Sequence, residues 1–171
     1  MCDTAGSLQP KEVQIDDELL KKTFLEHLNY IYYGKHHLLD FFNELKGLAS
    51  LKVLQMAIQE GTDDTENQIE QMDDVYSAIA EKPAKTNTLS LKAMTLEAYL
   101  TAIKSGKTPL EKDVSILFYL QRIEGVEIIY YKVLKNLAKA IGYSNTFLDQ
   151  SFDLAVENKV LFEEIYKEYI N

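Results

Sequence analysis

The spacing of four long amphipathic patterns restricts this chain to very few folds. Apolar residues recur at steps of three and four in four stretches: from Asp16 or Asp17 to Lys46, from Ser50 to about Glu81, from Thr108 to Gly142, and from Ser144 or Asn145 to about Tyr169. The first and third connections are only a few residues long, so each one forces an antiparallel helical hairpin. No alternation typical of a β-strand competes with these patterns.

The connection between the second and third patterns is much longer, at about 27 residues. It follows Pro83, which a helix interior does not accept, and it carries a shorter helical pattern from Leu91 to Ile103. A helix of about 30 residues is roughly 45 Å long, and such a linker can cover much of that length. We therefore predict an all-α, ferritin-like four-helix bundle with a long crossover that carries one short extra helix.

Composition supports one bundle of residues 16–171, preceded by a flexible N-terminal tail of residues 1–15. The 171 residues are 46% hydrophobic, which is enough for one core. The tail, MCDTAGSLQPKEVQ and one further residue, is polar and does not look like a signal peptide. Its Cys2 is the only cysteine, so no internal disulfide forms. We expect a cytoplasmic protein.

Charge and hydropathy exclude two classes of partner. The formal net charge is -9, which repels the phosphates of nucleic acids and anionic lipid head groups. No stretch approaches the roughly 18 apolar residues of a membrane span. We expect neither nucleic acid nor membrane as a partner.

The face of the first helix that should be buried contains a lysine. One stripe of that helix reads Phe24, Leu28, Ile31, Lys35, Leu38, Phe42 and Leu45. The other three helices carry acidic residues at similar heights: Asp64, then Glu124 and Glu127, then Glu157. Counted from the hairpins, Lys35 and Asp64 differ in height by only about 3 Å. The pattern predicts a polar layer across the bundle.

Each of these residues has a simpler interpretation. Asp64 and Glu157 could belong to solvated helix faces, because long surface helices carry many carboxylates. Lys35 could extend between helices and place its ammonium in water. Glu124 and Glu127 lie in the most apolar helix, so we expect at least one of them to be interior, where an unpaired carboxylate is costly.

Four segments carry a resemblance to a known family. They are LNYIYYGKHHLL, DDTENQIEQMDDVYSAIAEKP, RIEGVEIIYYKVLKNLAKAIG and VENKVLFEEI. Together they resemble the bacterial ferritin-like family of YciE- and YciF-type proteins (DUF892) over roughly residues 25–165. The resemblance implies a buried pair of iron or manganese ions held by carboxylates and histidine. Glu124, Glu127, Glu157 and Asp64 match the acidic positions of that site.

Three positions depart from the family pattern. Lys35 stands where the family has a glutamate, and family histidines fall at Gly61 and Gly125. An ammonium removes a negative charge and adds a positive one where the metal would lie. We hypothesise that Lys35 pairs with one of the four carboxylates and holds a vestigial metal site together without metal. No cofactor is then expected.

Other residues give little support for catalysis. His27, His36 and His37 do not share the spacing of three or four that metal ligands on one helix need. The tyrosines Tyr30, Tyr32, Tyr33, Tyr130 and Tyr131 fit a core as well as a redox role. The sequence also has no glycine-rich phosphate loop and no G-x-S-x-G nucleophile motif.

The function we predict is that of a non-catalytic, metal-poor bundle that forms a homodimer through an exposed apolar helix face. The family resemblance adds an expected association with stress. One alternative is a working di-iron or di-manganese protein with oxidoreductase or metal-handling activity. Another is a helical module that binds a protein partner and whose carboxylates are merely solvated.

Overall fold

Five helices make up nearly all of the described chain. The computed structural model describes residues 16–103, 106–143 and 146–170. The helices are α1 (Asp17–Leu45), α2 (Lys52–Ala78), α3 (Leu89–Ile103), α4 (Pro109–Ala140) and α5 (Thr146–Ile170). The predicted tail of residues 1–15 lies outside the described residues. Within the described ranges, no helix is both long and apolar enough to cross a membrane.

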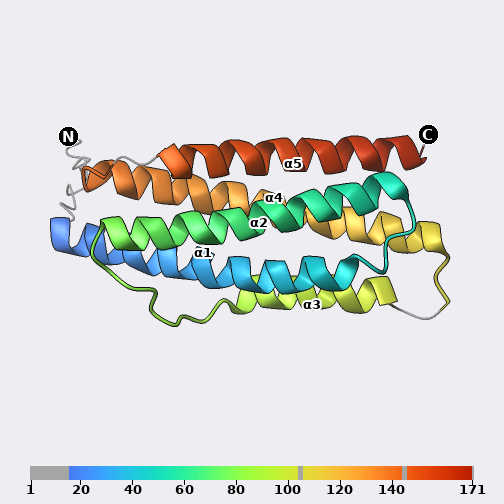
Figure 1. The fold of residues 1–171 in the computed structure, drawn as a ribbon, viewed down its shortest axis with the longest axis horizontal. Helices are drawn as coiled ribbons and strands as arrows, with labels where there is room; N and C mark the ends of the chain where they lie inside the picture. Colours follow the sequence, from blue (N-terminus) through green and yellow to red (C-terminus); the bar gives the residue numbers. More distant parts are fainter. Residues whose placement is uncertain (1–15, 104–105, 144–145, 171) are drawn as a thin grey trace, which may run out of the picture.

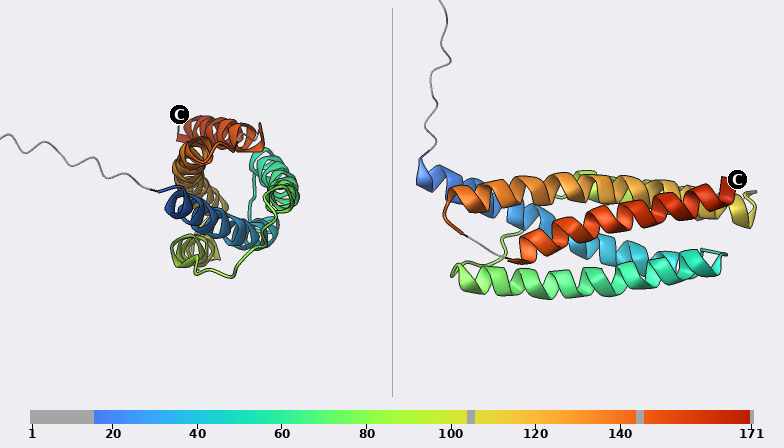
Figure 2. Two further views of the ribbon diagram at one scale, coloured as in Figure 1. Left: turned by 90° about the vertical axis from the view of Figure 1, so that its left-hand side faces the viewer. Right: turned by 90° about the horizontal axis from the view of Figure 1, so that it is seen from above.

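Four of the helices form a bundle and the fifth lies against its outside. Around the bundle the neighbours are α1 and α2, α2 and α5, α5 and α4, and α4 and α1. Helices α2 and α4 run in one direction, and α1, α3 and α5 run in the other (Figure 1). The end-on view of Figure 2 places α3 outside this ring, where it contacts α1 and α4. The predicted all-α bundle with a crossover helix is confirmed.

Local signals set several helix ends. Asp16 caps α1, because its Oδ1 accepts a hydrogen bond of 2.7 Å from the Leu19 backbone N–H. Thr108 and Glu111 form a capping box at the start of α4, and Pro109 is its first residue. Gly142 follows the end of α4 with a φ of 72°, a left-handed conformation that glycine adopts easily.

The start of α2 differs from the prediction. The expected helical stretch begins at Ser50, but the N-cap residue is Leu51, whose side chain makes no capping hydrogen bond. Asp113 of α4 supplies the acceptor instead. Its Oδ1 accepts from the Ser50 N–H at 2.9 Å, and its Oδ2 accepts from the Ser50 hydroxyl at 2.5 Å and from the Leu51 N–H at 3.0 Å. Asp113 is fully buried.

Two apolar clusters fill the bundle, with polar residues between them. One cluster includes Leu38, Ile58, Leu120 and Phe162. The other, toward the opposite end, includes Phe24, Ile31, Met72, Leu134 and Phe147. The buried polar residues between the two clusters are Lys35 on α1, Thr62, Thr65 and Gln68 on α2, Glu124 and Glu127 on α4, and Ser151 on α5. We call these residues, together with the hydroxyl of the neighbouring Tyr131, the polar layer.

Candidate functional site

Lys35 lies inside the bundle and pairs with a glutamate of α4. Its side chain is 2% exposed, and its Nζ donates a hydrogen bond of 2.6 Å to Oε2 of Glu127, whose side chain is 5% exposed. The same Nζ lies 5.7 Å from the centre of the Tyr131 ring, within cation–π range. The ammonium therefore does not reach water, and the interpretation of Lys35 as a lysine that extends to solvent is wrong.

The surroundings keep Lys35 charged. Burial lowers its pKa, because it disfavours the charged form. The negative charge of Glu127 acts in the opposite direction and, with smaller contributions from Tyr131 and Glu124, outweighs burial, so the pKa of Lys35 is raised. The result is a fixed internal ammonium that is held by its carboxylate partner.

Glu124 is the second buried carboxyl group of the polar layer, with an exposed fraction of 3%. Burial and then the charge of Glu127 raise its pKa well above the usual value, although Lys35 and a hydrogen bond with the side chain of Asn158 act against them. Both raising effects disfavour a second negative charge beside Glu127. The site favours the neutral form of Glu124, and the Lys35–Glu127 pair is itself neutral.

Asp64 reaches the layer only from its edge. The side chain is half-buried. Burial and the charge of Glu60 raise the pKa of Asp64, whereas the charge of Lys35 lowers it, so the carboxyl group lies close enough to sense the ammonium. Thr65 is buried, but its hydroxyl donates to the Gly61 carbonyl at 2.7 Å, within its own helix.

Glu157 does not take part in the layer, because its side chain is exposed. Asn158 takes the inward position instead and faces Glu124. A second pair, Ser151 and Tyr131, also faces each other across α5 and α4. Ser151 lies seven residues before Asn158, and Tyr131 lies seven residues after Glu124, so the two pairs fit one antiparallel register. A sequence signal for Asn158 exists: Ser151, Ala155 and Phe162 are buried, and residue 158 continues their spacing of four, three and four.

The two glycines at expected histidine positions differ from each other. A Cβ atom at Gly61 would lie 2.9 Å from Cζ of Phe42, whose buried ring fills the space beside the helix. A larger side chain at position 61 would therefore displace that ring. A Cβ atom at Gly125 would meet nothing within 4 Å. A side chain there would not enter the packed interior. The family histidine expected at position 125 would therefore not reach the polar layer.

The residues of the layer do not fit the metal pair that the resemblance implies. Within the described ranges, no three His, Cys, Asp or Glu side chains are grouped so that they could hold a metal ion. Glu157 is outside, Asp64 is at the edge, and the ammonium of Lys35 occupies the centre. His27 bonds instead to the Thr23 carbonyl of its own helix. The role of the four carboxylates as metal ligands stays a prediction.

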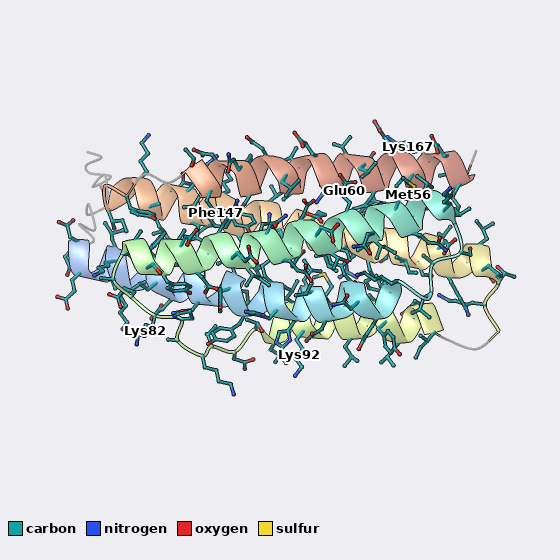
Figure 3. All side chains as sticks on the ribbon, in the orientation of Figure 1. Met56, Glu60, Lys82, Lys92, Phe147 and Lys167 are labelled. Carbon is teal, nitrogen blue, oxygen red and sulfur yellow. The ribbon has the colours of Figure 1, made fainter. Side chains whose placement is uncertain are left out.

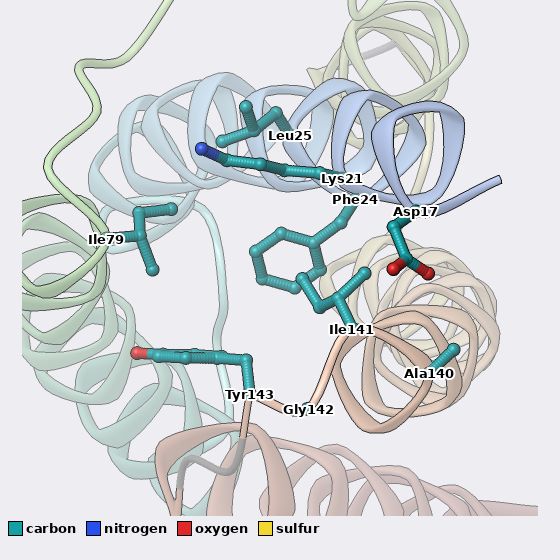
Figure 4. Close-up of a pocket in the computed structure, with 9 residues that line it drawn as sticks. All are labelled: Asp17, Lys21, Phe24, Leu25, Ile79, Ala140, Ile141, Gly142 and Tyr143. Carbon is teal, nitrogen blue, oxygen red and sulfur yellow. The ribbon is translucent and has the colours of Figure 1, made fainter.

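A separate pocket of about 520 Å³ opens at the end of the bundle where α1 begins (Figure 4). Phe24, Ile79 and Ile141 give it apolar walls, and Asp17 and Lys21 lie at its rim. Phe24 precedes Lys35 by 11 residues on the same helix, or about 16 Å along the axis. The pocket is therefore distinct from the polar layer.

Comparisons with known proteins agree with this architecture. The family described as Domain of unknown function (DUF892) matches residues 19–170, so the chain belongs to that family. The crystal structure of the Escherichia coli stress protein YciF is similar, with a TM-score of 0.84 and 20% identity over 89% of this chain and 97% of that one. No curated protein matches the sequence significantly.

A second solved structure gives the same fold at lower similarity. It is YcfI from Rhodopseudomonas palustris, for which a structural role has been suggested. The TM-score is 0.69 and the identity 20%, over 95% of this chain and 98% of that one. At this identity, both likenesses establish the fold alone.

Proposed function

We propose that this chain is a non-catalytic structural protein in which Lys35 replaces a metal ligand. The observation that carries the proposal is the buried hydrogen-bonded pair of Lys35 and Glu127, at 2.6 Å. The similarity of this chain to a stress protein and to a protein with a suggested structural role supports a structural role under stress.

Charge in the layer explains why an ion would bind poorly. A di-metal centre carries about four positive charges and needs several carboxylates to balance them. Here Glu127 is already balanced by Lys35, and the environment favours neutral Glu124. An incoming cation would meet a fixed ammonium and few available negative charges.

Metal content tests this proposal directly. Protein produced in medium supplemented with iron and manganese should contain far less than one ion per chain by elemental analysis. Lys35→Glu should raise the affinity for both ions, because it removes the ammonium and adds two donor oxygens.

The matched control is Lys35→Met, which removes the charge without adding donor atoms. It should bind less metal than Lys35→Glu. A wild-type content of about two ions per chain would overturn the proposal.

The alternative is a di-iron or di-manganese protein with oxidoreductase or metal-handling activity. One observation favours it: Oε2 of Glu124 is buried and has no hydrogen-bond partner among the described residues, as an unused ligand would be. An iron-oxidation assay separates the two functions. Wild-type protein that accelerates Fe²⁺ oxidation more than Glu124→Gln does would support the alternative.

We also propose that the protein forms a homodimer through the outer face of α3. Four apolar side chains on that face are exposed: Leu89 (64%), Leu96 (54%), Leu100 (54%) and Ile103 (40%). The opposite face of α3 is also apolar and packs on the bundle, with Leu91, Ala98 and Ala102 buried. A helix that is apolar on two opposite faces is typical of one that is covered on both.

Symmetry and charge favour a second copy of this chain as the cover. Leu89 and Ile103 each lie seven residues from Leu96, so an antiparallel α3 of a second copy, centred on Leu96, would pair Leu89 with Ile103 and Leu96 with itself. Leu100 would then lie at the height of Lys92. Helix α3 contains only Lys92 and Glu97 as charged residues, in a chain of net charge -9. Its outer face can approach a second copy with little repulsion.

Sedimentation analysis of Leu96→Glu tests the dimer. The wild type should sediment as a dimer and the variant as a monomer, because two carboxylates would meet at the symmetry axis. Met56→Glu is the matched control, since Met56 is 63% exposed but lies on α2. Figure 3 labels Met56 on α2 and Lys92 on α3. A wild-type monomer, or a dimer that survives Leu96→Glu, would show that something else covers this face.

A further inference from the structure

Three oxygen atoms of the polar layer are buried without a hydrogen-bond partner among the described residues. They are Oε2 of Glu124, the hydroxyl of Tyr131 and Oγ of Ser151. The exposed fractions of these residues are 3%, 0% and 1%. Buried polar atoms in native proteins almost always bond to protein or to ordered water. Three unpaired oxygens in one layer therefore require an explanation.

The ammonium of Lys35 adds to the unused hydrogen-bonding capacity. It carries three N–H donors. Within the described part of the chain, the bond to Glu127 is its one hydrogen bond. A buried charge is tolerated when its remaining donors are also satisfied. The layer thus contains unused donors as well as unused acceptors.

These groups lie close together. The Lys35 ammonium is 5.7 Å from the centre of the Tyr131 ring. Tyr131 has its pKa raised to about 12, chiefly by burial, and it also senses Lys35, Glu127, Ser151 and Glu124. Tyr131 and Ser151 face each other across α4 and α5 and interact, because a hydrogen bond with Ser151 acts to lower the pKa of Tyr131. Their two oxygens nevertheless do not reach the geometry of a full hydrogen bond. A small molecule that bonds to both hydroxyls would satisfy them.

Several neighbouring side chains in the layer are small, although α2 also contributes the longer Gln68. Helix α2 contributes Gly61, Thr62 and Thr65 as buried residues, and α5 contributes Ala155. Both threonine hydroxyls donate to carbonyls of their own helix, Thr62 to Ile58 and Thr65 to Gly61. These threonine hydroxyls therefore do not satisfy the unpaired oxygens. Because the threonine side chains are short, the centre of the layer is left to the longer side chains.

We infer that the polar layer binds internal water molecules. One water bridges the hydroxyls of Tyr131 and Ser151, and another links the Lys35 ammonium to Oε2 of Glu124. Each of these waters has at least two polar partners, which is what a buried water needs to remain bound. The inference does not depend on the proposed structural role, since it concerns only how the layer is satisfied.

Water suits these atoms better than an ion does. A cation would be repelled by the Lys35 ammonium, which is fixed by its bond to Glu127. An anion would be repelled by the carboxylate of Glu127. Water is neutral and can both donate and accept, so it matches a set that mixes hydroxyls, a carboxyl oxygen and an ammonium.

The sign of a stability change tests the inference in solution. Removing a hydroxyl that binds water should destabilise the fold, whereas removing a dry, unpaired hydroxyl should stabilise it. Tyr131→Phe and Ser151→Ala should each lower the denaturant midpoint. The double variant should lose less than the sum of the two, because both changes release the same water. A midpoint raised by either single variant would overturn the inference.

A high-resolution crystal structure of the full chain, with anomalous data for iron and manganese, gives the second test. Density peaks without anomalous signal should lie within hydrogen-bonding distance of Tyr131 and Ser151 and of Glu124. A layer without such peaks would overturn the inference and leave the proposed function intact. Peaks with anomalous signal would instead identify bound metal and overturn both.

Discussion

Lys35→Ala should lower the free energy of unfolding by about 3–5 kcal/mol, because it leaves the carboxylate of Glu127 buried without its partner. Glu127 is almost fully buried, and its Oε2 receives a hydrogen bond of 2.6 Å from the ammonium. Shortening the lysine also removes methylene packing between the two apolar clusters. Chemical denaturation followed by far-UV circular dichroism measures the loss.

The double variant Lys35→Met with Glu127→Leu separates the charge effect from packing. Both replacements are apolar and similar in volume to the originals, so no unpaired charge remains. Replacing a buried ion pair in this way is often neutral or stabilising. We expect stability close to that of the wild type. If Lys35→Ala alone lost less than about 1 kcal/mol, the pair would behave like an exposed salt bridge, and its assigned role would be wrong.

Asp113→Ala should lower the free energy of unfolding by about 3 kcal/mol, because Asp113 is the one side chain among the described residues that caps the start of α2. Asp113 is 0% exposed and accepts three hydrogen bonds, two from Ser50 and one from the Leu51 N–H. Without it, two backbone donors and a hydroxyl lose their acceptor. The same denaturation experiment measures the change.

Two further variants serve as controls for Asp113→Ala. Asp113→Asn keeps one acceptor oxygen and should lose less. Asp149→Ala removes an exposed aspartate whose ion pair with Lys135 spans 2.7 Å, and it should cost about 1 kcal/mol or less. Equal losses for Asp113→Ala and Asp149→Ala would contradict the capping role of Asp113.

The sequence was sufficient for most of the fold because helix ends depend on nearby residues. Thr108 and Glu111 lie three residues apart, and Gly142 stops α4 through its own backbone conformation. The lengths of the connections then left one plausible bundle. The cap of α2 was missed because Asp113 lies 62 residues from Leu51, and only the folded bundle brings them together.

Prediction of the layer succeeded where a residue lay in the middle of an apolar stripe. Lys35 is flanked by Ile31 and Leu38 on the same helical face, so spacing placed it on the buried stripe. The contact with Glu127 then decided between an interior ammonium and one that reaches water. Glu157 was placed wrongly by one residue, because the choice between Glu157 and Asn158 depends on how α5 is rotated against α4. That rotation follows from packing between helices, which no local pattern specifies.

The mid-bundle pair also has a consequence for how the helices are aligned during folding. A purely apolar core would tolerate α1 sliding against α4 by one turn, since leucine and isoleucine replace one another with little loss. With Lys35 and Glu127 present, the same shift would separate the two opposite charges and leave each without a partner among hydrocarbon side chains. We expect the pair to exclude shifted packings, as a single buried polar residue fixes the register of a coiled coil.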